Sequence, residues 1–353
     1  MMAPVAIIET QHLRKVFRSV KRYPGVGGAI RSLFTREYVE KAAVEDVNLS
    51  MESGELVGYI GPNGAGKSTT IKMLTGILVP TSGEIRVAGL VPHQRRKENA
   101  RNIGVVFGQR SQLYWDLPLR ESFELLRAIY AVPRQRYREN LARFSDILAL
   151  DEFMATPVRQ LSLGQRMRGD FAAAMLHDPG IIYLDEPTIG LDVVAKEAIR
   201  EFIARVNEER GTTVILTTHD LADVERLCRR IILIDDGRVV FDGPIDRLRD
   251  EYGTHRTLVV TLSESCPDLR FPHTELVEQE ANVVHLRFDR RKITAEQLIR
   301  QVTERCTISD VSIVEPELED IIRRIYLEGY RTQTSAVPSS AEGPVPSSAE
   351  GPA

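Results

Sequence analysis

The amino-acid sequence predicts an α/β fold with a mostly parallel sheet. Three short segments, the first of them uniformly apolar, are typical of buried parallel strands, and they alternate with two segments of helical character. In chain order these segments are 181–184, 195–210, 212–217, 221–229 and 231–234. Earlier in the chain, an apolar stretch ending at Ile60 leads into Gly61-Pro62-Asn63-Gly64-Ala65-Gly66-Lys67-Ser68-Thr69, which fits G-x-x-x-x-G-K-[ST] in full. A helix-favouring stretch follows, so the context is the strand, loop and helix of a phosphate-binding loop.

The glycine-rich run has the chemistry that binding a nucleotide phosphate requires. Gly61, Gly64 and Gly66 let backbone N–H groups turn inward around an anion, and the following helix points its positive end at the same place. Lys67 is expected to reach the β- and γ-phosphates, and Ser68 to bind Mg²⁺. Asn63 and Thr69 are the remaining candidate contacts to ATP in this run. An ordinary glycine-rich turn before a helix is the alternative, and it leaves the Gly-Lys-Ser-Thr register unexplained.

Outside these elements the chain divides into three further regions. A first strand at 7–12 precedes a basic segment, 14–36, that holds seven Lys and Arg residues and no acid. A strand at 83–87, two helices within 119–150 and a helix at 165–177 are expected around the centre of the chain. Pro133 separates the two helices, and the first is expected to bury one face, made of Phe123, Leu126, Ile129 and Tyr130.

After residue 254 the pattern restarts. Half-buried strands at 257–262 and 283–288, with amphipathic helices at 295–306 and 317–326, predict a small α/β accessory domain over 254–331. The tail, 332–353, contains VPSSAEGP twice in tandem. Pro, Ser, Gly and Ala cannot bury a core, so the tail is predicted to be disordered.

Composition excludes some functions. The net charge of the 353 residues is −4, which argues against a dedicated nucleic-acid binder. The three cysteines, Cys228, Cys266 and Cys306, show no pairing pattern, as suits a reducing cytoplasm. No stretch approaches the ~18 consecutive apolar residues of a membrane span, so the chain is not expected to cross a membrane itself.

Two carboxylates, Asp185 and Glu186, end the apolar strand 181–184. The carboxyl ends of strands face the ligand crevice in open α/β sheets. Asp185 is expected to hold Mg²⁺ through water, and Glu186 to orient or deprotonate the attacking water. A solvated strand end is the alternative for such a pair taken alone, but the presence of Lys67 earlier in the chain favours the catalytic interpretation.

Four further motifs accompany these residues. They are Leu161-Ser162-Leu163-Gly164-Gln165 at the start of a helix, Gln109 after an apolar stretch, Thr218-His219-Asp220 after a strand, and Gly190-Leu191-Asp192. As a set, residues 5 to about 245 resemble the ATP-binding cassette of ABC transporters. The sequence departs from the commonest form at Leu163, where glycine is usual, and at Ile189, where a smaller residue is usual.

The resemblance implies a role for each motif. Ser162, Gly164 and Gln165 belong to the signature sequence, which caps the γ-phosphate bound to the opposite subunit. Gln109 is then the glutamine that touches the metal and the water, His219 contacts the γ-phosphate, and Asp192 lies in the loop that crosses the dimer interface. An aromatic ring ahead of the phosphate loop stacks on adenine in the family; Tyr38 is the first candidate here and Phe17 the alternative.

The implied architecture is a cassette over 1–250, with a helical subdomain at about 112–165, followed by the accessory domain. The implied active unit is a homodimer that binds ATP and Mg²⁺ and works with a permease at the cytoplasmic face of the membrane. Glu315-Pro316-Glu317-Leu318-Glu319-Asp320-Ile321 resembles the E-P-x-L-E-D segment of drug- and lipid-export ATPases, which indicates the ABC-2 type export branch. The basic segment 14–36 resembles an insertion that faces the membrane partner in polysaccharide-export ATPases; a solvated hairpin is the equal alternative.

The main alternative function is a soluble ABC ATPase that acts on nucleic acid or ribosomes. Repair members usually carry a long insertion between the phosphate loop and the signature, whereas only 95 residues separate Lys67 from Ser162. A GTPase or kinase is a third alternative, but the chain has no N-K-x-D motif. The transported substrate is not readable from the sequence.

Overall fold

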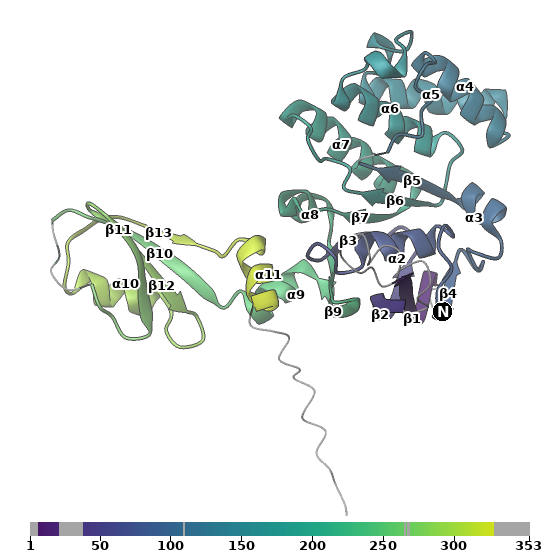
Figure 1. Ribbon diagram of the computed structural model, residues 1–353. Coiled ribbons are helices and arrows are strands. Elements are labelled where there is room, and N and C mark those ends of the chain that lie inside the picture. The colour runs from purple at the N-terminus through teal and green to yellow at the C-terminus, as the bar shows by residue number, and fades with distance from the viewer. Residues whose placement is uncertain (1–5, 21–37, 109, 265, 267–268, 328–353) are drawn as a thin grey trace, which may run out of the picture.

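The computed structural model describes residues 6–20, 38–108, 110–264, 266 and 269–327. Most of the basic segment, Gln109 and the repeated tail lie outside these ranges. The predicted α/β class, with a mostly parallel sheet and a second small sheet, is confirmed (Figure 1).

A nine-stranded sheet forms the centre of the larger unit, in the order β4-β1-β2-β9-β8-β3-β7-β6-β5. Its strands are β1 (Ala6–Val20), β2 (Tyr38–Glu52), β3 (Leu56–Ile60), β4 (Ser82–Val87), β5 (Ile103–Phe107), β6 (Ile181–Asp185), β7 (Thr213–Thr217), β8 (Arg230–Asp235) and β9 (Arg238–Pro244). The run from β8 through β3, β7 and β6 to β5 is parallel, and β1, β2 and β4 pair antiparallel. The parallel strands therefore end at one edge, where the motifs gather.

The helices on this sheet are α2 (Lys67–Leu74), α3 (Arg96–Asn102), α6 (Leu163–Met175), α7 (Val193–Arg210), α8 (Leu221–Leu227) and α9 (Ile245–Tyr252). Side chains cap the N-termini of two of them, α6 and α7. The Asp192 side chain caps α7 by accepting from the Ala195 N–H, and Gly211 ends that helix with a φ of 63°. Ser162 and Gln165 form a reciprocal capping box at the start of α6.

A helical layer stands on the β5–β6 side of the sheet (Figure 1). It contains α4 (Leu119–Ile129), α5 (Arg134–Leu148), two short 3₁₀ turns at Leu150–Glu152 and Val158–Gln160, and α6. Pro133 precedes α5, as predicted. The predicted buried face of α4 is wrong at one position, because Ile129 is 57% exposed while Phe123 and Leu126 are buried.

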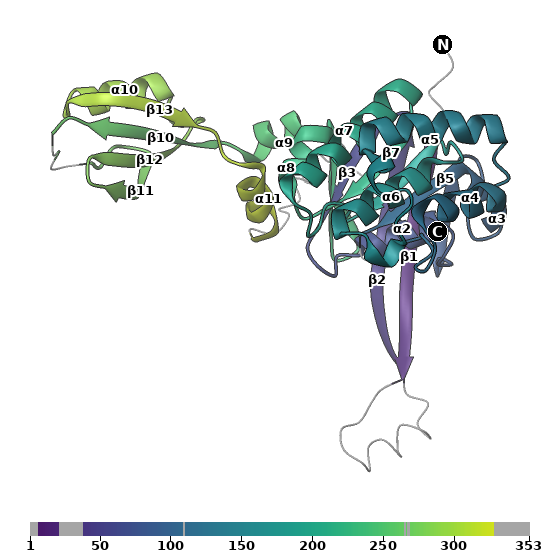
Figure 2. The ribbon, with the colours of Figure 1, turned by 90° about the horizontal axis from the view of Figure 1, so that it is seen from above.

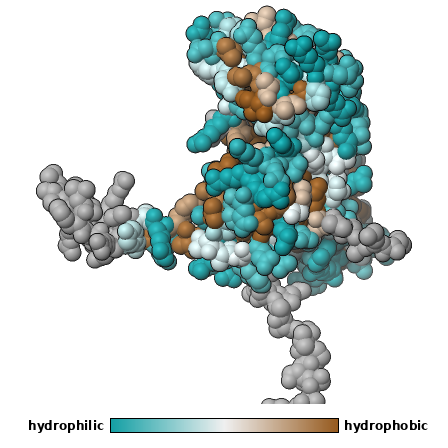
Figure 3. Space-filling view, turned by 90° about the vertical axis from the view of Figure 1, so that its right-hand side faces the viewer, coloured by the Kyte–Doolittle hydropathy of each residue, from teal (hydrophilic) through white to brown (hydrophobic). Residues whose placement is uncertain are grey.

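This layer also presents hydrophobic side chains to solvent. Brown residues gather on its surface in Figure 3 within a mostly hydrophilic face. Its exposed large hydrophobics include Tyr114, Trp115, Leu125 and Ile129.

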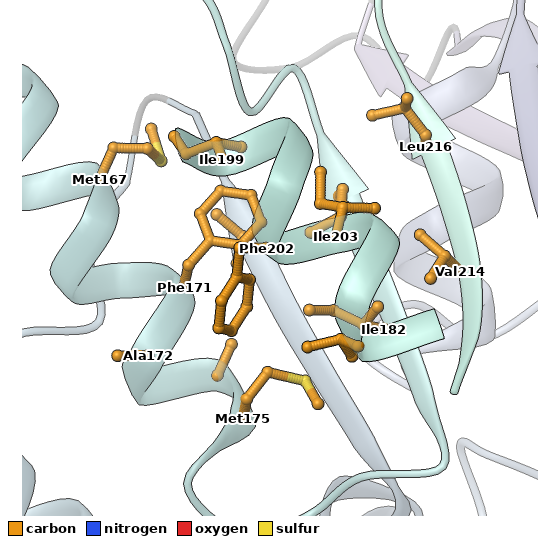
Figure 4. Packing of buried hydrophobic residues seen from close by; sticks show 14 of the residues in the cluster. Met167, Phe171, Ala172, Met175, Ile182, Ile199, Phe202, Ile203, Val214 and Leu216 are labelled. Atoms are coloured by element: carbon orange, nitrogen blue, oxygen red, sulfur yellow. The ribbon is translucent and has the colours of Figure 1, made fainter. Parts of the chain in front are cut away.

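The layer is held to the sheet by aromatic and aliphatic packing between α6 and α7 (Figure 4). The Phe171 ring of α6 meets the Phe202 ring of α7 edge to face, with centroids 5.8 Å apart, and Phe144 of α5 meets Phe202 at 5.4 Å. All three side chains are at most 1% exposed. The start of α6, with its signature residues, is thereby fixed relative to the sheet.

Strands β1 and β2 extend beyond the sheet as a hairpin that projects from the body of the molecule (Figure 2). The outer pairs run from Val16 opposite Ala42 to Val20 opposite Tyr38. Arg18 and Glu40 form an ion pair of 2.7 Å across the two strands.

The second unit is a four-stranded antiparallel sheet in the order β11-β12-β10-β13, set apart from the first in Figure 1. It comprises β10 (His255–Leu262), β11 (Thr274–Glu280), β12 (Val283–Asp289), α10 (Ala295–Thr303) and β13 (Ile308–Val314). Alternate residues of β10 and β12 are buried with Leu298 and Val302 of α10. A disulfide joins Cys266 to Cys306, which corrects the expectation of unpaired cysteines; a separation of 40 residues hides this pairing from spacing arguments.

The last described helix, α11 (Leu318–Leu327), returns to the first unit. Its buried residues Leu318, Ile321, Ile322 and Ile325 join the core cluster that contains Ile245 and Leu248 of α9. The sequence placed this helix in the accessory domain, because its apolar periodicity does not say which core it faces.

Among the described residues, no helix combines the length and the hydropathy that a membrane crossing needs.

Candidate functional site

The glycine-rich run lies between the end of β3 and the start of α2, as predicted. Gly64 and Gly66 have φ values of 90° and 105°, which favour glycine. A Cβ atom at Gly66 would overlap the carbonyl oxygen of Ala43, and one at Gly61 would overlap that of Ile234. Asn63 is exposed at the tip of the run, and Ser68 and Thr69 stand in the first turn of α2. The loop is thus a backbone cradle that tolerates no side chain at two of its glycines.

The Lys67 ammonium group folds back over this cradle. Its Nζ donates to the carbonyl oxygens of Gly61 at 2.5 Å and Pro62 at 3.2 Å. Partial burial lowers the Lys67 pKa, while the negative charges of Glu186 and Asp185 act in the opposite direction. The cation is therefore positioned at the loop and faces both carboxylates.

The first carboxylate lies beside the loop. Ser68 Oγ donates to Asp185 Oδ1 at 3.3 Å, and Thr217 Oγ1 donates to the same oxygen at 2.6 Å. Hydroxyl and carboxylate oxygens are the ligands that Mg²⁺ prefers, so Ser68 and Asp185 fit such an ion. Thr217, at the end of the neighbouring strand β7, is a member of this group that sequence reasoning missed.

The second carboxylate pairs with the predicted histidine. Glu186 Oε2 lies 2.6 Å from His219 Nδ1 and also accepts from the His219 backbone N–H at 3.4 Å. Glu186 has a φ of 55°, a left-handed conformation uncommon outside glycine. Such strain is often stored at functional sites. Glu186 and His219 follow the adjacent strands β6 and β7, so they share one edge of the sheet.

Gln109 lies outside the described residues, but its neighbour Gly108 is placed. The Gly108 N–H donates to the Asp185 carbonyl oxygen at 2.8 Å, and a Cβ atom at Gly108 would overlap the carbonyl oxygen of Glu186. The loop after β5 therefore passes directly beside both carboxylate-bearing residues.

The signature residues form a separate group. Ser162 Oγ accepts from the Gln165 N–H at 3.2 Å, and Gln165 Oε1 accepts from the Ser162 N–H at 3.0 Å. A Cβ atom at Gly164 would lie 3.1 Å from the Ala195 Cβ, so the signature adjoins the start of α7 capped by Asp192. No hydrogen bond among the described residues joins this group to the phosphate loop.

A buried ion-pair network behind Glu186 and His219 was not anticipated. Asp223 of α8 is fully buried, accepts from Thr188 Oγ1 at 2.6 Å and pairs with Arg200 of α7. Next to it, Lys196 donates to Asp220 at 2.6 Å and holds the Asp220 pKa below its usual range. The network ties the segment after Glu186 to the segment after His219. No local pattern signals this network, because the residues three before and three after Asp223 are also charged, Asp220 and Arg226.

Register separates the two candidates for adenine stacking. Tyr38 lies on the projecting hairpin opposite Val20 and is 60% exposed. Five residues of β2 separate it from Ala43, or about 17 Å at the rise of an extended strand. Phe17 is paired with Lys41, two residues from Ala43, and is 42% exposed with Lys15 Nζ 5.4 Å from its ring centroid. The structure does not bring Tyr38 to the phosphate loop and favours Phe17 as the stacking ring.

We therefore expect Phe17→Ala to weaken ATP binding about tenfold, the usual worth of a base-stacking ring. Tyr38→Ala should leave the affinity unchanged, and Phe17→Tyr should restore it. Calorimetric titration of each variant with ATP measures the effect. If only the Tyr38 variant bound ATP more weakly, Tyr38 would be the ring that stacks on adenine.

The arrangement has one chemical use that involves all its parts. Backbone N–H groups and Lys67 can surround phosphates, Ser68 and Asp185 can hold a divalent cation, and Glu186 with His219 can position water at a terminal phosphate. These are the functional groups that a nucleoside triphosphate hydrolase requires.

Comparisons with known proteins agree with this chemistry. Residues 44–189 match the family model described as ABC transporter. Residues 243–326, from β9 to α11, match the model described as ATP-binding protein DrrA1-3-like, C-terminal domain.

Three curated relatives illustrate the range of likeness. The chain is 34% identical to the ABC transporter ATP-binding protein NatA of Bacillus subtilis over 206 residues, 58% of this chain and 83% of NatA. It is 31% identical to the methionine import ATP-binding protein MetN of Latilactobacillus sakei, over 83% of this chain and 87% of MetN. It is 32% identical to the Nod factor export ATP-binding protein I of Ralstonia nicotianae, over 72% of this chain and 80% of that protein.

A similar solved structure is a dimeric ATP-binding cassette in a post-hydrolysis state, bound to ADP and Pi. It superposes with a TM-score of 0.56 at 28% identity, over 67% of this chain and 98% of that chain.

Proposed function

Since this chain belongs to the ATP-binding cassette family of ABC transporters, whose members hydrolyse ATP to power transport, we propose that it drives export through a separate integral-membrane permease. The observation that carries the proposal is the grouping around the phosphate loop. Lys67, the Ser68–Asp185 contact and the Glu186–His219 pair all lie at one edge of the sheet. Together they supply what hydrolysis at the γ-phosphate of ATP requires.

Each residue has a proposed part in that reaction. The loop N–H groups and Lys67 bind the β- and γ-phosphate oxygens, and Glu186 takes up or directs a proton of the attacking water. His219, held by Glu186, donates to the γ-phosphate, and Gln109 completes the water and metal contacts. Mg²⁺ held by Ser68, Gln109 and Asp185 would supply positive charge against the phosphate oxygens.

The site is proposed to be completed by a second copy of the chain. Each chain has one phosphate loop and one signature, and the signature group of Ser162, Gly164 and Gln165 makes its own contacts away from the loop. The start of α6 offers N–H groups and the positive end of the helix dipole, which suit a phosphate. In a head-to-tail pair these groups would cap the partner's ATP, with Asp192 at the interface. ATP would close the pair, and hydrolysis with product release would reopen it.

Export, rather than import, is supported by the accessory domain. The region 243–326 resembles the DrrA1-3-like C-terminal domain, and Glu315 to Ile321 resemble a segment of drug- and lipid-export ATPases. The relatives alone do not decide the direction, because one is an import protein and another an export protein.

Two surfaces are proposed to meet the permease. The exposed side chains of Tyr114, Trp115, Leu125 and Ile129 belong to the helical layer and its adjoining loop, where they offer an apolar contact. The projecting part of the β1–β2 hairpin carries the exposed basic residues Arg18 and Lys41. Through such contacts the chain would sit at the cytoplasmic face of the membrane as a peripheral subunit, with no role for nucleic acid.

The test is recovery of a partner from native membranes. Tagged Glu186→Gln chain is incubated with detergent-solubilised membranes and Mg-ATP, with Lys67→Ala as the control that should bind ATP weakly. Recovery of a multi-spanning protein with either chain supports the proposal, and the identity of that protein reports the cargo class. A dimer that recovers ribosomes or DNA instead would establish the alternative, a soluble ABC ATPase.

A further inference from the structure

A buried carboxylate in the signature helix holds the loop that follows β5. Asp170 of α6 is 5% exposed. Its Oδ1 accepts from Ser111 Oγ at 2.9 Å and from the Gln112 N–H at 3.0 Å, and its carbonyl oxygen accepts from Gln112 Nε2 at 3.0 Å. Three hydrogen bonds thus join one helical residue to two consecutive loop residues.

The helix and this loop are also in close van der Waals contact. Gly169 precedes Asp170, and a Cβ atom there would lie 2.9 Å from Leu119 and 3.1 Å from Leu113. Leu113 and Leu119 are buried. The loop and the start of α4 are therefore packed against this helix, and a larger residue at Gly169 would displace the Leu113 and Leu119 side chains.

One end of this packed unit lies at the carboxylates, and the other end lies at the signature residues. The loop begins at Gly108, whose N–H is bonded to Asp185 and whose Cα lies against Glu186. The helix is capped by Ser162, eight residues before Asp170, a distance of about 12 Å along the helix axis. A shift of the loop at the carboxylates is therefore carried by a rigid helix to the signature residues.

We propose that Asp170 is a positioning residue that couples the two ATP sites of the dimer. It fixes the loop beside the carboxylates of its own site to the helix whose start completes the partner's site. The proposal rests on the head-to-tail dimer of the proposed function. ATP in one site, by holding loop residues 110–113 against α6, orients the signature that the second ATP needs, and the second ATP acts on the first site in the same way.

The ionisation of the Asp170 carboxyl group favours stable hydrogen bonds to the loop. Burial raises its pKa to about 6, while the bonds from Gln112 and Ser111 and the charge of Arg166 favour the ionised form. At neutral pH the carboxylate is ionised and makes charge-assisted bonds, which are stronger than neutral ones. An asparagine has the same shape and an acceptor oxygen, so it keeps the contacts in weaker form.

The test compares Asp170→Ala with Asp170→Asn in steady-state ATPase assays. The wild-type dimer is expected to show a Hill coefficient approaching about 2, the number of its sites, and the alanine variant about 1. The kcat of the alanine variant should fall about tenfold, because misplaced groups lose rate steeply. Its affinity for ATP as an open monomer should stay within about twofold, because the bonds lost lie outside the phosphate loop. Asp170→Asn should keep most of the cooperativity.

Asp178→Asn is the matched control. Asp178 follows the other end of α6, pairs with Arg136 and Arg210, and does not touch the loop. It should lower the melting temperature without changing the Hill coefficient. Ser111→Ala removes one of the three bonds and should lower the Hill coefficient less than Asp170→Ala does, which keeps the test available if the alanine variant fails to fold.

Two results would overturn the proposal. One is an unchanged Hill coefficient in a folded Asp170→Ala or Ser111→Ala chain, and the other is an equal loss in Asp178→Asn. Light scattering of the Glu186→Gln chain with ATP measures whether the dimer forms. This measurement separates a failure of the coupling proposal from a failure of the proposed dimer. If no ATP-dependent dimer forms, the proposed function fails; if it forms and Asp170→Ala stays cooperative, only the coupling fails.

Discussion

Replacing Glu186 with glutamine is expected to lower the ATPase rate by about 10²–10³-fold, the usual contribution of a positioned general base. The glutamine keeps the shape of the side chain and a contact with His219, but it cannot accept the proton of water. Since ATP stays intact, the variant should accumulate as an ATP-bound dimer. Phosphate release and light scattering measure the two effects.

A neighbouring acid provides the control for Glu186. Glu201 lies on the exposed face of α7, where it pairs with Arg205 four residues on. Glu201→Gln should leave the rate unchanged, because such exposed pairs contribute little. A Glu186→Gln chain that hydrolyses ATP at the wild-type rate would remove Glu186 from the reaction.

Replacing Lys67 with alanine is expected to weaken ATP binding about 100-fold, equivalent to about 3 kcal/mol, the worth of strong hydrogen bonds to a charged group. The loss has two sources. The ammonium group no longer meets the phosphates, and it no longer bonds to the carbonyl oxygens of Gly61 and Pro62 that it holds in the structure. Calorimetric titration with ATP measures the affinity.

Lys72, in the last turn of the same helix, provides the control for Lys67. Lys72→Ala removes an equal charge at the other end of α2 and should change the affinity for ATP by less than about twofold. If Lys67→Ala bound ATP as tightly as the wild type, the phosphate loop would have another function.

The central chemistry was predictable because few residue types can perform it. Only glycine can stand at Gly66 against the Ala43 carbonyl oxygen, and the residue at the end of β6 must supply an acceptor oxygen that meets both Ser68 and Thr217. Such constraints act over a few consecutive residues, so they leave a readable motif. The roles of these residues in catalysis remain predictions.

Long-range packing was less predictable. The periodicity of α11 marks an apolar face without naming its partner, and the helix joined the core of the first unit rather than the accessory domain. Tyr38 has a suitable offset from the phosphate loop along the chain, but the length of the hairpin carries it outward. In both cases the outcome depends on contacts with elements distant in the sequence, which no local pattern contains.

The buried polar contacts were the hardest to predict. Asp170 bonds to Ser111 across 59 residues, and Asp223 bonds to Thr188 across 35. Each appears in the sequence only as an acid within a helix. A buried charge needs a partner, so such an acid signals a polar contact without identifying the other side.

The central claim is that each ATP site is completed by the signature of a second chain, and cross-linking tests it most directly. Two Glu186→Gln chains are mixed, one with Ser162→Cys and the other with Asn63→Cys, so that any bond between the new thiols joins two molecules. A control mixture pairs Asn63→Cys with Glu208→Cys, an exposed site toward the far end of α7. The account predicts a cross-linked dimer in the first mixture that requires Mg-ATP. No cross-link above the control, or equal cross-linking without ATP, would contradict it.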